Sequence, residues 1–144
     1  MGLALAEAEL AAAHDDVPVG AVVVDARGEV IARAHNRREV DQDPLGHAEL
    51  LALRAAAEVT GRWRLDGCAL IVTLEPCAMC AGALVSSRID RIVYGAFDDK
   101  AGAAGSIWDL PRDRASLHNP QVTSRVRAEE CRRVLRSFFA AKRA

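Results

Sequence analysis

The sequence predicts an α/β fold in which a central β-sheet is flanked by helices, within a single domain that spans residues 1–144. Three observations predict it. Helical and strand-like segments alternate along the chain, no internal repeat or linker divides it, and 144 residues are enough to bury a sizeable core.

The first half of the chain predicts a helix, two strands and a second helix. Residues 3–14 are rich in alanine, which has the highest helix propensity, and residues 17–25 (VPVGAVVVD) have the composition of a buried strand. The turn ARGE then leads into a second strand at residues 30–34, which indicates a hairpin. Apolar residues recur at helical spacing from Ala48 to Val59, and Gly61 is a typical helix stop.

The second half predicts two further strands and two further helices. CALIVT at residues 68–73 and RIVYG at residues 91–95 are strand-like, and Pro76 between them suits the first turn of a helix from about Cys77 to Ser86. The Gly- and Ala-rich residues 98–106 predict a loop. A final helix places most of its arginines opposite an apolar side formed by Cys131, Val134, Leu135, Phe138 and Phe139.

The composition predicts a soluble, cytoplasmic protein with no membrane segment. Hydrophobic residues make up 51% of the chain, yet no apolar run approaches the roughly 18 to 20 residues that cross a bilayer. Glu7 and Glu9 stand where a secretion signal would carry basic residues. Four cysteines are too few and too unevenly spaced for a disulfide scaffold, which favours a reducing compartment.

The charge is unevenly distributed although the net charge is only −1. Residues 121–144 hold seven basic residues against Glu129 and Glu130, a local net charge of +5. Such a basic end could meet the phosphates of a nucleic acid, and it could equally be a solvated helix face.

Cys77 and Cys80 in the stretch TLEPCAMCAG are candidate metal ligands. A disulfide or a redox pair are the alternatives, but the redox motif is expected after the first strand of a thioredoxin-like unit, and this one follows the third. In the first turn of a helix, the i, i+3 spacing puts both sulfurs on one face, where unpaired backbone N–H groups favour thiolates. If the two neighbouring helices start at the same edge of the sheet, His47 completes a His/Cys/Cys zinc set.

Three protein ligands leave one zinc position open, which is typical of catalytic sites. Zinc lowers the pKa of water at that position, but two thiolates weaken the effect, so a nearby base is needed. Glu49, two residues from His47, is the candidate general acid/base that takes a proton from water and returns it to a leaving amine.

HAE at residues 47–49 with PCAMC at residues 76–80 matches the signature of the zinc deaminases. VPVGAVVV, HNR, GHAE, TLEPCAMCAGAL, RIVYGAFDDKAGAAGS and the terminal SFF occur in the same order as in the bacterial tRNA-specific adenosine deaminases, which the chain resembles over nearly its whole length. The resemblance implies a cytidine-deaminase-like three-layer sandwich with a mixed sheet, a homodimer, about one Zn²⁺ per chain, and conversion of adenosine to inosine at the first anticodon position of an arginine tRNA.

The same resemblance implies substrate-binding residues. Asn36 would hydrogen-bond the flipped adenosine, and Asp98 would lie near the adjoining sugar or backbone. Lys100 and Ser106, with the basic last helix, would hold the anticodon loop.

Two other functions remain open at the level of sequence. One is deamination of a free base or nucleoside such as guanine or cytidine, which uses the same zinc chemistry but has less use for a basic last helix. The other is a non-catalytic zinc module, which would need a fourth ligand such as Cys68 or His35.

Overall fold

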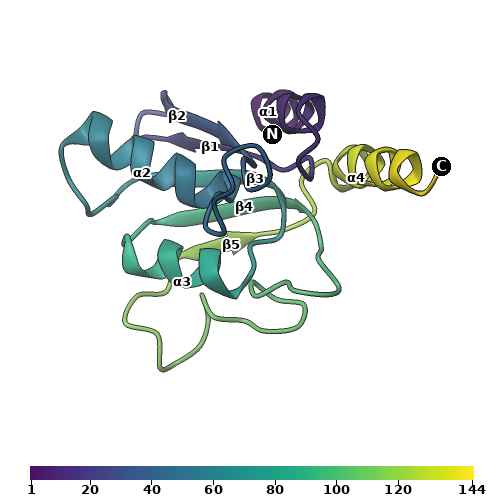
Figure 1. Ribbon diagram of the computed structural model, residues 1–144. Coiled ribbons are helices and arrows are strands. Elements are labelled where there is room, and N and C mark those ends of the chain that lie inside the picture. The colour runs from purple at the N-terminus through teal and green to yellow at the C-terminus, as the bar shows by residue number, and fades with distance from the viewer.

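The computed structural model describes residues 1–144 and shows a five-stranded mixed sheet with the strand order β2-β1-β3-β4-β5 (Figure 1). β1 pairs antiparallel with both β2 and β3, whereas β3 pairs parallel with β4, and β4 parallel with β5. The bounds are β1 Gly20–Val24, β2 Val30–His35, β3 Ala69–Leu74, β4 Arg91–Ala96 and β5 Gln121–Thr123.

Helices cover both faces of this sheet and make a three-layer α/β/α sandwich, as the sequence predicted (Figure 1). On one face, α2 (Ala48–Thr60) packs on β1 and β2 beside α3 (Ala78–Ser86). On the other face, α1 (Gly2–Ala13) contacts β1, and α4 (Ala128–Arg143) contacts β4. No helix in the chain combines the length and apolarity needed to span a membrane.

The larger core lies between the sheet and α2 and α3, where branched side chains such as Leu70, Val72 and Ile92 are fully buried. On the opposite face of the sheet, the backbone of α1 lies very close to the start of β1. A Cβ atom at Gly20 would lie 2.0 Å from the carbonyl oxygen of Ala4 in α1, so only glycine fits there. The absence of a side chain at Gly20 therefore lets α1 pack directly on the start of β1.

The structure corrects two details of the predicted elements. The short strand β5 was not predicted, because only three residues, Gln121–Thr123, pair with the edge of β4. Pro76 was expected within the first turn of a helix, but it precedes the N-cap residue Cys77, and α3 begins at Ala78. The loop at residues 98–106 contains no helix or strand, as predicted.

Candidate active site and metal centre

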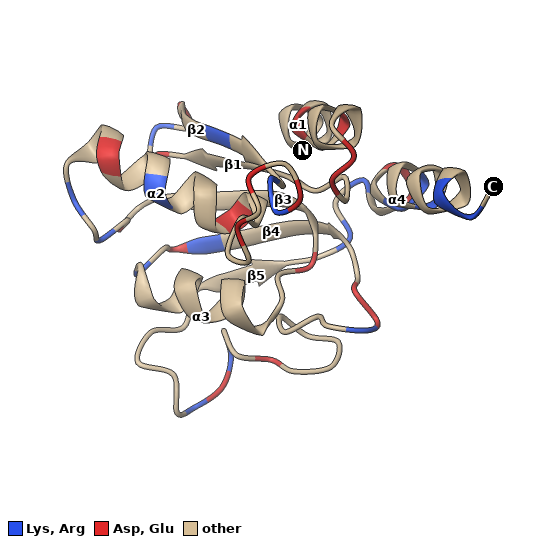
Figure 2. Cartoon of the chain, in the orientation of Figure 1, with Lys and Arg blue, Asp and Glu red and all other residues tan.

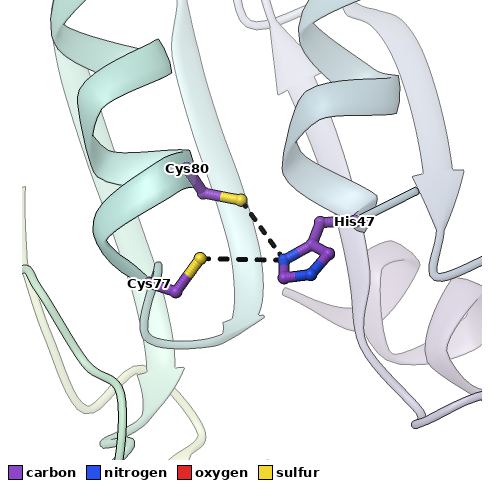
Figure 3. Close-up of side chains that lie close together, drawn as sticks. All are labelled: His47, Cys77 and Cys80. Atoms are coloured by element: carbon purple, nitrogen blue, oxygen red, sulfur yellow. Dashed lines mark hydrogen bonds between the residues drawn. The ribbon is translucent and has the colours of Figure 1, made fainter. Parts of the chain in front are cut away.

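Two helix N-termini meet at the edge of the sheet and carry the three predicted metal ligands. His47 is the N-cap residue of α2 and Cys77 that of α3, and neither side chain makes a capping hydrogen bond. Cys80 follows one turn into α3. Because α2 and α3 begin at the same edge, the imidazole and the two thiols point toward one another (Figure 3).

The geometry of these three side chains fits a tetrahedral zinc ion. His47 Nδ1 lies 3.7 Å from Cys77 Sγ and 3.5 Å from Cys80 Sγ, and all three donor atoms are within 4.8 Å of one another. Ordinary Zn–N and Zn–S bond lengths at a tetrahedral angle require N···S separations of about 3.6 Å. The donor set can therefore close around zinc with little movement, through Nδ1 of His47.

The two thiols of this set differ in acidity. A hydrogen bond from Cys80, assisted by His47, lowers the pKa of Cys77 to about 4. The same contact with Cys77, together with burial, raises the pKa of Cys80. The hydrogen bond to Cys77 also raises the pKa of His47. A thiolate thus forms readily at Cys77, and a divalent cation would supply the positive charge that a second thiolate at Cys80 needs.

Glu49 lies in the first turn of α2 and is only 4% exposed. Burial raises the pKa of its carboxyl group to about 7. Its side chain lines the same cavity as His47 and Cys77 without being one of the three clustered donors. A carboxyl group beside the metal site, outside the ligand set, is suited to moving protons.

The site opens into a cavity of about 170 Å³ that also contains Asn36 and Asp98. The Oδ1 atom of Asn36 accepts a hydrogen bond from the backbone N–H of Ala48 at 3.0 Å and so caps α2 in place of His47. The side-chain N–H₂ group of Asn36 makes no hydrogen bond within the protein and can donate to a molecule in the cavity. The sequence did not indicate this capping contact.

The remaining predicted substrate residues are less directly placed. The Oδ1 atom of Asp98 accepts hydrogen bonds from the backbone N–H groups of Lys100 and Ala101. Lys100 is exposed and lines a neighbouring groove beside α4, and Ser106 directs its hydroxyl to another protein group, Glu75, at 2.9 Å. The structure thus brings Asn36 and Asp98 to the cavity and leaves Lys100 and Ser106 outside its wall.

Two buried carboxylates in the cavity wall were not identified from the sequence. Asp16 and Glu75 are each 1% exposed, and both line the cavity. Asp16 accepts hydrogen bonds from the backbone N–H groups of Glu39 and Val40, in the loop that leads to His47. An acid at the end of an otherwise apolar strand, as Glu75 is after β3, is the signal that could have identified the second one.

A fourth protein ligand is absent from the cluster. Cys68 is buried in the main core, and His35 lies 2.7 Å from the carboxylate of Glu7. Neither belongs to the group of donors around His47, so the structure argues against a closed, purely structural zinc site.

Residues 1–96 match the model of the cytidine and deoxycytidylate deaminase zinc-binding region. The chain belongs to this deaminase family. Zinc is therefore the cofactor of this deaminase, and His47, Cys77 and Cys80 are positioned to hold it. When bound in such a site, zinc acidifies water at its open position.

Several known proteins are similar to this deaminase over most of its length. The tRNA-specific adenosine deaminase of Bacillus subtilis (strain 168) is 48% identical over 136 residues, which is 94% of this chain and 84% of that protein. A structure from a study of A-to-I editing by tRNA:A34 deaminases has a TM-score of 0.90 at 44% identity and covers 94% of this chain and 97% of that one. The guanine deaminase of Nitrosomonas europaea has a TM-score of 0.80 at 29% identity, covering 96% and 82%.

Proposed function

We propose that this deaminase converts adenosine to inosine at the first anticodon position of a tRNA, with an arginine tRNA as its substrate. The observation that carries the proposal is the likeness to the tRNA:A34 deaminase, at 44% identity and a TM-score of 0.90 over nearly both whole chains. The guanine deaminase shares the fold at the lower identity of 29%.

The reaction is a hydrolysis in which the C6–N6 bond of adenine breaks, a C6–O bond forms, and ammonia leaves. Glu49 takes the proton from the attacking water and delivers it to the departing nitrogen. The N–H₂ group of Asn36 holds the base within the cavity. Burial supports the role of Glu49, because bulk water does not compete for protons at a side chain that is 4% exposed.

The cavity has room for only a single base. Its volume of about 170 Å³ is below the roughly 300 Å³ of common ligand pockets, so neighbouring nucleotides must stay outside. Turning the base out of a stacked loop costs a few kcal/mol, which contacts to those neighbours must offset. Free adenosine cannot make these contacts, so we expect it to be a much poorer substrate.

Part of the basic C-terminal region is available for these outer contacts. Figure 2 shows basic residues along α4 and at its end, but four basic side chains of this region pair with acids. Arg125 lies over the ring of Phe97, 5.4 Å from its centroid, and Arg133 has no acidic partner. These two arginines are the best candidates for phosphate or base contacts. The paired residues are Arg127, Arg132, Arg136 and Lys142.

A homodimer is part of the same proposal. The groove between α2 and α3 is mostly apolar and includes Leu50, Leu53 and Trp63. Trp63 is 64% exposed. A second copy would cover this surface. Light scattering at micromolar concentration should give about twice the mass of 15.5 kDa, and a monomer with full activity would contradict this part of the proposal.

The decisive experiment is incubation of the purified protein with an arginine tRNA transcript, followed by sequencing for inosine. The matched control is the same transcript with guanosine at the first anticodon position. We also expect free guanine, cytidine and adenosine to be deaminated far more slowly. Rapid turnover of guanine with no inosine in any tRNA would instead assign the protein to the deaminases of free bases.

A further inference from the structure

Glu75 differs from the other acidic residues in the number of backbone groups that it binds. Its Oε1 atom accepts a hydrogen bond from the N–H of Asp98 at 3.2 Å. Its Oε2 atom accepts from the N–H groups of Ala104 at 3.0 Å and Ser106 at 3.1 Å, and the Ser106 hydroxyl lies 2.9 Å from the same oxygen. Both oxygens are used as acceptors by one segment of the chain.

That segment, residues 98–106, contains three of the four predicted substrate-binding residues and no helix or strand of its own. Its shape therefore depends on its attachments. Besides the bonds to Glu75, the N–H of Ala103 donates to the carbonyl oxygen of Pro76 at 2.8 Å. The segment is thus fastened to the two residues that immediately precede Cys77, at the start of the metal-binding helix.

The packing at Gly102 shows how closely the segment fits around this carboxylate. A Cβ atom at Gly102 would lie 2.4 Å from Glu75 Oε2 and 2.2 Å from Ser106 Oγ. No other residue can stand there without displacing one of these groups. This close packing around Glu75 indicates that the segment has a fixed shape.

We propose that Glu75 is a positioning residue that sets substrate recognition by holding Asp98 and its loop at the rim of the cavity. This inference rests on the proposed function, since the loop would contact the nucleotides beside the target adenosine. Glu75 is not a metal ligand, and it acts through the loop. Its loss should therefore weaken recognition of RNA while the metal content and the deamination step are preserved.

The change Glu75→Gln tests this with little change in volume. An amide has one oxygen, and we expect it to face Ala104 and Ser106, because that orientation keeps most of the acceptor bonds. The amide N–H₂ group then faces the N–H of Asp98, and two donors cannot bond each other. The substitution should thus release Asp98 selectively.

The experiment combines amide hydrogen exchange with kinetics on an anticodon stem-loop. In Glu75→Gln, the Asp98 amide should exchange at least about ten-fold faster while those of Ala104 and Ser106 stay protected. KM for the stem-loop should rise roughly ten-fold, with kcat within about two-fold and zinc content unchanged. Glu58→Gln, an exposed change on α2, is the matched control and should behave as wild type.

The outcomes separate this inference from the proposed function. If wild-type protein forms no inosine in the stem-loop, the proposed function fails. If wild type is active and Glu75→Gln has the same KM and a protected Asp98 amide, the positioning role is refuted. Should Glu75→Gln not fold, Ser106→Ala removes the hydroxyl contacts to Glu75 and to the carbonyl oxygen of Asp98, and it must then raise both KM and exchange at Asp98 for the inference to stand.

Discussion

Replacing Glu49 by glutamine should abolish turnover while leaving the metal site intact. The change keeps the volume of the side chain and removes its ability to accept a proton. General acid/base groups contribute about 10²- to 10⁴-fold to rate, which corresponds to about 3 to 5 kcal/mol of activation free energy. Glu49 is only 4% exposed, so solvent cannot replace it, and we expect the loss to lie at the upper end of that range.

The assay is single-turnover formation of inosine in a stem-loop, measured with zinc analysis and thermal unfolding on the same preparation. We expect about one zinc per chain in Glu49→Gln and in wild type. Tm should not fall, because burial raises the pKa of Glu49 and thus disfavours its charged form in the folded state. Activity within ten-fold of wild type would refute the role of Glu49 as the proton carrier. Loss of zinc would show instead that Glu49 supports the metal.

Three further predictions address the ligands, the base contact and the packing. Cys80→Ser should lower zinc content well below one per chain, because a neutral hydroxyl replaces a thiolate; full zinc occupancy by metal analysis would contradict the ligand set. Asn36→Asp keeps the oxygen that caps α2 but loses the N–H₂ donor, so kcat/KM should fall at nearly unchanged Tm. Asn36→Ala loses the capping oxygen as well and should also lower the free energy of unfolding by about 1 kcal/mol. Equal Tm values for the two variants would argue against the cap. Gly20→Ala places a methyl group 2.0 Å from the Ala4 carbonyl oxygen and should cost about 3 kcal/mol or more, or roughly 10 °C in Tm by calorimetry. An unchanged Tm would show that α1 can move away freely.

Signals confined to a few consecutive residues explain what the sequence could predict. The apolar spacing from Ala48 and the stop at Gly61 located α2 within a residue, and Gly61 adopts the expected left-handed conformation with φ of 67°. The Cys77 and Cys80 spacing likewise depends only on local helix geometry. The convergence of His47 with these cysteines followed from one topological assumption, that two helices begin at the same edge, which the structure confirms.

Features that depend on distant partners could not be predicted in this way. The strand β5 forms against the free edge of β4, and its three residues, although two are β-branched, are too few to show the alternation that marks a strand. Glu75 receives hydrogen bonds from residues 23 to 31 positions away, so nothing near it in the sequence marks its partners. The ion pairs that neutralise part of α4, including Lys142 with Asp15, also join segments that are far apart in the chain.

The residues of the site lie on two kinds of structure, and this difference affects substrate choice. Glu49, the proposed proton carrier, and the three residues positioned to bind the metal stand at the starts of two packed helices, whereas Asp98 stands in an irregular loop held by one buried carboxylate. A guanine deaminase has the same fold with a TM-score of 0.80, so this architecture is compatible with more than one substrate. Changes confined to residues 98–106 should therefore alter the ratio of activity on RNA to activity on free bases. Because those residues contain none of the three metal-binding donors, that ratio should change while zinc content stays constant.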